Sequence, residues 1–129
     1  MAIVVGYIPT KEGAAALARA GEEAVLRKTD LVVINSNRDG AGDDSEQLDR
    51  LGDDLKAQGV TVTVRQLIRG NEPAEDLISV AEELSAELIV IGLRRRTPVG
   101  KLLLGSNAQR ILLEATCPVL AVKAPEGAE

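Results

Sequence analysis

Histidine is absent from this 129-residue sequence, which also has one cysteine, one tyrosine and neither phenylalanine nor tryptophan. Without an imidazole, catalytic triads that use a histidine base are excluded, and a single thiol cannot build a zinc site of the Cys/His kind. Because unpaired bases usually stack on aromatic rings, this composition and the net charge of −5 argue against single-stranded nucleic acid as a partner. The same charge argues against an anionic membrane surface.

Long apolar runs are also missing. No stretch reaches the roughly 20 apolar residues that span a bilayer, and the apolar start at residues 2–8 has neither preceding basic residues nor a following cleavage site. One unpaired cysteine and no export signal predict a cytoplasmic protein. The length and the 45% apolar content predict one domain with an aliphatic core over residues 1–124, followed by a flexible tail at 125–129.

Short β-branched runs alternate with longer amphipathic stretches, a pattern typical of βαβ units and a parallel sheet. Right-handed crossovers then predict an α/β fold, an open, doubly wound, Rossmann-like sheet of five strands in the order 3-2-1-4-5, with two helices on each face. Thr10 is the expected N-cap of the first helix, and Gly59 is expected to follow the second. The predicted strands are residues 3–7, 31–35, 60–67, 88–92 and 119–122; the predicted helices are 13–27, 45–58, 71–84 and 107–115, with a loop at 36–44.

Ligands of such sheets bind beyond the carboxyl ends of the strands, where the strand order reverses. The segment after the fourth predicted strand has the parts of an anion site. Gly92 allows close approach, and Gly105 lets the backbone turn so that the amides of Ser106 and Asn107 point at a phosphate. The Ser106 hydroxyl adds a donor, and the basic residues Arg94, Arg95, Arg96 and Lys101 add positive charge to an otherwise acidic chain.

This segment resembles the nucleotide loop of the universal stress protein family, whose pattern is Gly, two residues, Gly, nine residues, then Gly with Ser or Thr. Gly92, Gly105 and Ser106 match, while Arg95 stands at the second glycine. Residues 86–92 and 117–122 extend the resemblance. After the first strand, where ATP-binding members place an aspartate, this chain has Ile8, Pro9 and Thr10.

The resemblance implies a regulatory nucleotide-binding module of the stress response, not an efficient enzyme. ATP, with Mg²⁺ carried by the nucleotide, would lie with its base near Ile8 and Val33. The phosphates would rest on residues 105–107, and a homodimer would form through the strand Val119–Val122. The implied binding residues are Ile8, Pro9, Thr10, Val33, Gly92, Arg94, Arg95, Gly105, Ser106 and Asn107.

Alternatives stay open at this stage. The two departures from the motif also fit a nucleotide-free dimeric interaction protein, and an adenylate-forming relative of the same fold is a third possibility that lacks a visible catalytic motif. Gly105-Ser106 has a plainer interpretation as a helix cap, and the arginines as a solvated loop tip. Cys117 is expected to be a small buried apolar residue, and Tyr7 is either pocket wall or core.

Overall fold

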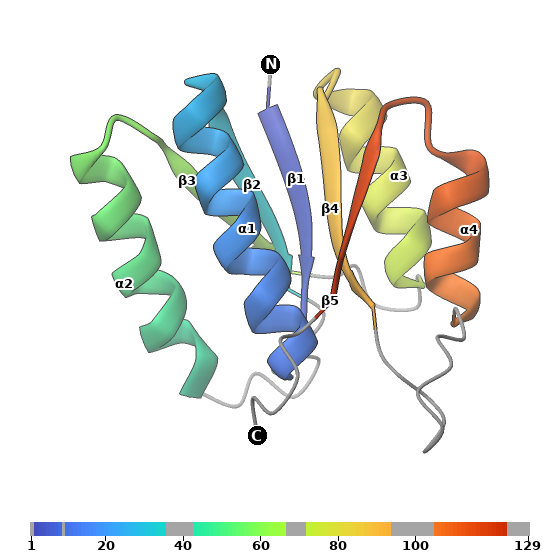
Figure 1. Ribbon diagram of the computed structural model, residues 1–129, viewed down its shortest axis with the longest axis horizontal. Coiled ribbons are helices and arrows are strands. Elements are labelled where there is room, and N and C mark those ends of the chain that lie inside the picture. The colour runs from blue at the N-terminus through green and yellow to red at the C-terminus, as the bar shows by residue number, and fades with distance from the viewer. Residues whose placement is uncertain (1, 9, 36–42, 67–71, 94–104, 124–129) are drawn as a thin grey trace.

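The computed structural model describes residues 2–8, 10–35, 43–66, 72–93 and 105–123, apart from the side chains of 43–45 and 47. Five parallel strands form one sheet in the order β3-β2-β1-β4-β5, which confirms the predicted α/β fold (Figure 1). The strands are β1 Ala2–Tyr7, β2 Asp30–Asn35, β3 Val62–Gln66, β4 Leu88–Leu93 and β5 Val119–Lys123; the helices are α1 Lys11–Arg27, α2 Asp43–Ala57, α3 Pro73–Glu83 and α4 Ser106–Glu114.

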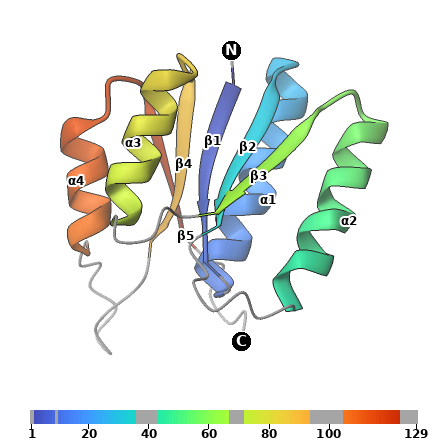
Figure 2. The same ribbon diagram turned by 180° about the vertical axis from the view of Figure 1, so that it is seen from behind.

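Two helices cover each face of the sheet, as predicted. Figures 1 and 2 show α1 and α2 on one face and α3 and α4 on the other. Alternate β1 residues divide between two cores: Ile3 and Val5 pack with α1 and α2, and Val4 packs with α3 and α4. All three side chains are fully buried. Covering both faces explains why the central strands are apolar throughout.

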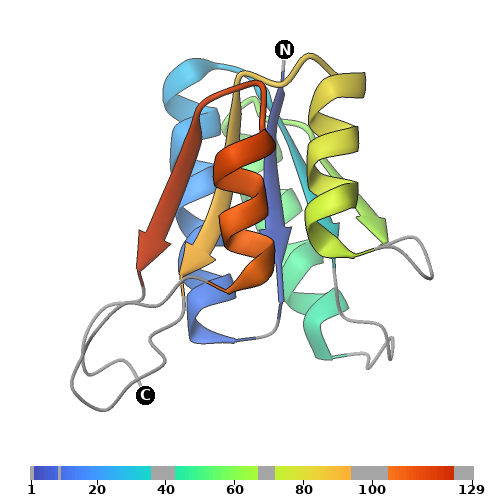
Figure 3. The ribbon, with the colours of Figure 1, turned by 90° about the vertical axis from the view of Figure 1, so that its right-hand side faces the viewer.

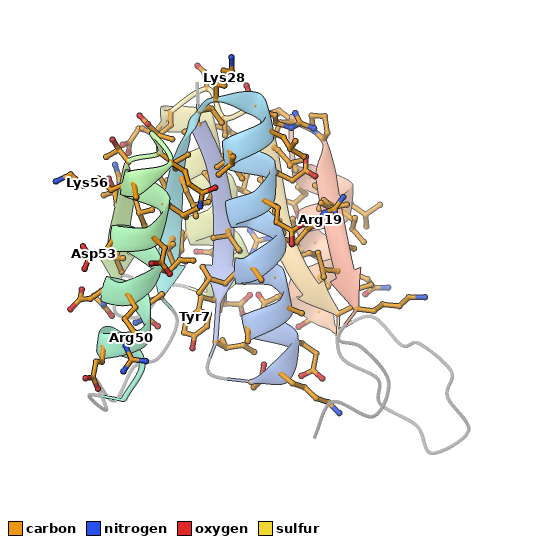
Figure 4. The ribbon with its side chains drawn as sticks, turned by 60° about the vertical axis from the view of Figure 1, so that its left-hand side comes forward. Tyr7, Arg19, Lys28, Arg50, Asp53 and Lys56 are labelled. Carbon is orange, nitrogen blue, oxygen red and sulfur yellow. The ribbon has the colours of Figure 1, made fainter. Side chains whose placement is uncertain are left out.

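Tyr7 belongs to the core, which settles the choice left open by the sequence. It lies at the carboxyl end of β1, paired in register with Asn35 of β2, and is 2% exposed. Figure 4 shows its side chain between α1 and α2. It therefore packs on the face of the sheet opposite α3 and α4.

Several predicted boundaries were wrong by one or two residues. β3 begins at Val62, because Val60 is buried in the turn after α2 and does not pair. α2 begins at Asp43, two residues before the predicted start, and α4 begins at Ser106, one residue before it. The expected start at Asn71 lies outside the described residues, and the N-cap of α3 is Glu72.

Two predicted caps are confirmed. The Thr10 hydroxyl accepts a hydrogen bond from the backbone N–H of Gly13 at 3.0 Å, which satisfies one of the free donors in the first turn of α1. Gly59 has a φ of +87°, a left-handed conformation that favours glycine after a helix. Among the described helices, none combines the length and the apolar character needed to cross a bilayer.

Candidate functional site

A pocket lies where the strand order reverses, at the carboxyl ends of β1 and β4. Figure 3 shows that α3 and α4 begin at this same end of the sheet. The cavity holds about 170 Å³. Apolar side chains form most of its wall, and it is lined by Gly6, Ile8, Glu12, Gly13, Pro73, Leu77, Ile91, Gly92, Asn107, Ala108 and Ile111.

Glycines allow the first turn of α1 to sit directly on the strand ends. A Cβ atom at Gly13 would lie 1.9 Å from the carbonyl oxygen of Ile8. A Cβ atom at Gly92 would lie 2.5 Å from the carbonyl oxygen of Glu12. Gly92 therefore has a packing role toward α1, whereas its place in the sequence predicted that its lack of a side chain serves the close approach of a ligand.

The start of α4 is the best candidate for holding an anion. Gly105 is the N-cap and, being a glycine, has no side chain of its own to cap the helix. Its carbonyl oxygen accepts from the Gln109 N–H at 3.0 Å, which begins the helical ladder. The amides of Ser106, Asn107 and Ala108 precede that bond and have no acceptor among the described residues, and amides in the first turn of a helix attract negative charge.

Gly105 does not adopt a conformation that needs glycine. Its φ of −68° and ψ of 165° are extended values open to any residue. The expectation that a glycine-specific turn aims the amides was therefore wrong. The consequence for a ligand is different: with no side chain at the N-cap, nothing at this position competes for the amides of α4.

Asn107 joins two helices, a contact that the sequence did not reveal. Its Oδ1 accepts a hydrogen bond from the backbone N–H of Ala74 at 3.2 Å. Because Glu72 makes no capping bond through its side chain, Asn107 caps α3 from a neighbouring helix. The Asn107 side-chain oxygen is thus engaged within the protein. Any contact of Asn107 with an anion would therefore be made by its backbone amide.

Arg110 strengthens the same junction. Its guanidinium lies 3.6 Å from Glu72 and 3.2 Å from Glu75 of α3, and 3.2 Å from Glu114 one turn along α4. The hydrogen bond to Glu75 raises the pKa of Arg110 above its ordinary value, and the nearby charge of Glu114 adds to this. These contacts, together with Asn107, hold the starts of α3 and α4 together beside the pocket.

The structure brings some predicted site residues together and not others. Ile8, Gly92 and Asn107 line the pocket, and Gly105 and Ser106 begin α4 beside it. The Thr10 hydroxyl is engaged in its cap. Pro9, Arg94, Arg95, Arg96 and Lys101 lie outside the described residues.

Val33 does not reach the pocket. It is fully buried and packs in the core beneath α1 and α2, paired in register with Val5. A base cannot contact a residue with no exposed surface, so the prediction for Val33 was wrong. Sequence reasoning also missed Glu12 and Gly13; the only available signal was their place in the first turn of a helix that follows β1.

Cys117 was predicted to be buried, and the structure corrects this: the residue is only partly buried and packs beside the core. It packs against the residues between the sheet and the α3–α4 layer. Burial raises the pKa of its thiol, which lowers the fraction of reactive thiolate.

Both the sequence and the fold are similar to those of known proteins. The model of the Universal stress protein family matches residues 1–123. A universal stress protein of Mycolicibacterium smegmatis is 45% identical over 130 residues, a match that spans 97% of this chain and 98% of that protein.

Two solved structures carry nucleotides. The universal stress protein from Archaeoglobus fulgidus in complex with dAMP is 29% identical, with a TM-score of 0.71 over 95% of this chain and 98% of that one. A universal stress protein in complex with cAMP is 25% identical, with a TM-score of 0.74 over 97% and 98%. Because the family model and the mycobacterial relative each span nearly the whole sequence, this chain belongs to the universal stress protein family.

Proposed function

We propose that this chain binds an adenine nucleotide, with ATP as the full ligand, and acts in the cytoplasm as a regulatory dimer of the stress response. The relatives solved with dAMP and cAMP support an adenine nucleotide. The pocket between β1 and β4 supports the position, because ligands of doubly wound sheets bind where the strand order reverses.

The observation that carries this proposal is the start of α4 beside an apolar pocket, where the N-cap is a glycine and the first amides have no acceptor among the described residues. The phosphates rest on the amides of Ser106 and Asn107, with the Ser106 hydroxyl as a further donor. The Ser106 side chain is exposed and so is open to a ligand. The contribution of Arg94 and Arg95 remains part of the proposal, as extra positive charge near the phosphates.

The pocket suits the less charged part of the nucleotide. Ile8 is 37% exposed and lines the cavity together with Ile91 and Gly92, so a base can pack against apolar surface there. At about 170 Å³ the cavity is smaller than the roughly 300–1,000 Å³ of whole small-molecule sites. The nucleotide would therefore insert one end and extend its phosphates along α4.

Catalysis is not part of this proposal. Among the described residues, no three cysteine or acidic side chains are grouped to hold a metal ion, so Mg²⁺ would arrive with the phosphates. A nucleotide bound in this way changes the surface near the carboxyl ends of the strands, where a partner protein can detect it.

The dimer is proposed through β5, which is one edge of the sheet. Its residues Val119–Val122 are apolar and partly exposed, and within the described part of the chain no strand pairs with their outer edge. The opposite edge, β3, carries Thr63, Arg65 and Gln66, and Arg65 is paired with Glu83 at 3.0 Å. Charged and polar residues discourage pairing at an edge, so two copies would meet through β5 about a twofold axis.

Mass spectrometry of the small molecules released from purified protein, followed by titration with MgATP, tests the function directly. We expect an adenine nucleotide in the released fraction and saturable binding of ATP. Protein that releases no nucleotide and does not bind ATP in titration would instead be a nucleotide-free interaction module.

A further inference from the structure

One acidic residue, Glu12, is part of the lining of the proposed nucleotide pocket. Among the described residues that form its wall, Glu12 is the only ionisable one; the others are glycines, aliphatic residues, a proline and Asn107. Glu12 is partly buried. In the described part of the chain its carboxylate makes no ion pair, in contrast to Glu22 and Glu23 of the same helix, which both contact Arg19.

The backbone of Glu12 is held firmly in place. Thr10 caps the turn through Gly13, and Gly13 in turn packs on the carbonyl of Ile8. A Cβ atom at Gly92 would lie 3.2 Å from the Cβ of Glu12, so the Glu12 side chain leaves α1 beside the end of β4. Its position is therefore set by tight contacts and does not depend on a ligand.

A glutamate in the first turn of a helix has a simple structural explanation, because negative charge there is favourable to the helix dipole. That explanation is satisfied equally well by a side chain facing solvent. It does not account for a glutamate in the lining of a mostly apolar pocket, where a carboxylate can only accept hydrogen bonds. A ligand that fills this pocket must therefore bring donors to Glu12.

The charge also orients the ligand. Phosphates are repelled by Glu12 and attracted by the first amides of α4, so the anionic end lies toward Ser106. The part of a nucleotide that remains near Glu12 is neutral and must donate. The adjacent 2′- and 3′-hydroxyls of a ribose are two such donors, close enough together to bond to the two oxygens of one carboxylate.

From this arrangement we propose that Glu12 accepts hydrogen bonds from the ribose hydroxyls, so that the chain selects ribonucleotides over 2′-deoxynucleotides. The inference rests on the proposed nucleotide function and names the sugar that the site accepts. Removing one hydrogen bond to a charged acceptor typically weakens binding by about tenfold to a hundredfold, which sets the expected preference for ATP over 2′-deoxy-ATP.

Calorimetric titration with ATP and with 2′-deoxy-ATP tests the proposal in the wild type, Glu12→Gln and Glu12→Ala. Glu82→Gln is the matched control, because it removes the same charge from an exposed position outside the pocket. We expect the wild type and the control to prefer ATP by about tenfold or more. In Glu12→Ala the ratio should fall to about one, mainly through weaker ATP binding, with Glu12→Gln in between.

The outcomes are separable. Equal affinity of the wild type for both nucleotides, or an unchanged ratio in Glu12→Ala, overturns the role of Glu12 and leaves the nucleotide function standing. Tighter ATP binding by Glu12→Ala overturns it too, because the carboxylate would then only repel phosphate. No binding of either nucleotide by the wild type overturns the proposed function itself. If Glu12→Ala fails to fold, the isosteric Glu12→Gln decides the question.

Discussion

The contact between α1 and the end of β1 predicts opposite effects of one substitution at two helical glycines. In Gly13→Ala, the new Cβ atom would lie 1.9 Å from the carbonyl oxygen, 2.9 Å from the carbonyl carbon and 3.0 Å from the nitrogen of Ile8. All three are backbone atoms, which cannot rotate aside as the tip of a side chain can. Restoring normal contact requires α1 to move by roughly 1.5 Å.

The clash outweighs the helix propensity that alanine adds. Alanine is favoured over glycine in a helix by about 1 kcal/mol, whereas forcing extra volume into a packed contact costs about 1–3 kcal/mol and sometimes more. Because the obstructing atoms are backbone, we place the clash at about 3 kcal/mol, and subtracting the roughly 1 kcal/mol that alanine adds leaves a net loss in the free energy of unfolding of about 2 kcal/mol, with Tm lower by about 6–10 °C. ATP binding should weaken as well, because Ile8, Glu12 and Gly13 all line the pocket.

Gly52→Ala in α2 is the control. The nearest atom to its new Cβ is the Cβ of Val62 at 3.9 Å, an ordinary contact. This variant should gain about 0.5–1 kcal/mol of stability through helix propensity alone. Urea unfolding of both variants and the wild type measures the difference. A Gly13→Ala protein as stable as the wild type would refute the close packing of α1 on the strand end.

Three further predictions concern single groups. Thr10→Ala should lower the free energy of unfolding by about 1 kcal/mol through loss of the cap on Gly13, whereas Thr10→Ser keeps a hydroxyl and should retain most of that stability. Urea unfolding measures both variants, and equal losses of stability in the two would contradict the cap. Asn107→Ala leaves the Ala74 N–H without its acceptor and should lower the free energy of unfolding by about 1–3 kcal/mol. Asn107→Asp keeps an acceptor and should lower it by less in the same assay. For Cys117, burial raises the thiol pKa, so the rate of alkylation should reach half its maximum at a higher pH in native protein than in urea; stability should also fall as pH rises through this range, because the native state holds the proton more tightly. Identical pH midpoints in the two states would count against that burial.

The sequence was sufficient for the architecture because each element has its own local pattern. Apolar runs such as residues 31–35 and 88–92 mark buried strands without any knowledge of their neighbours. The cap at Thr10 and the glycine after α2 are likewise set within a few residues. These local signals fix the order of strands and helices, and the handedness of crossovers then fixes the sheet.

The site was less predictable because its contacts join distant parts of the chain. Val33 was misplaced because a strand that is apolar on both faces does not reveal which residues face which helix. The bond from Ala74 to Asn107 spans 33 residues and has no local signature. The pocket position of Glu12 depends on two glycines, Gly13 and Gly92, that allow α1 to meet the strand ends.

The central claim is that the first amides of α4 hold the phosphates, and substitution of Gly105 tests it most directly. The extended backbone of Gly105 is open to any residue, so neither Gly105→Asp nor Gly105→Ala should strain the backbone dihedral angles. Aspartate is a strong N-cap that would occupy the amides with its own negative charge.

Titration with ATP should therefore show binding lost in Gly105→Asp and retained in Gly105→Ala, while urea unfolding shows the aspartate variant to be at least as stable as the wild type. ATP binding of unchanged affinity in a folded Gly105→Asp protein would contradict the claim.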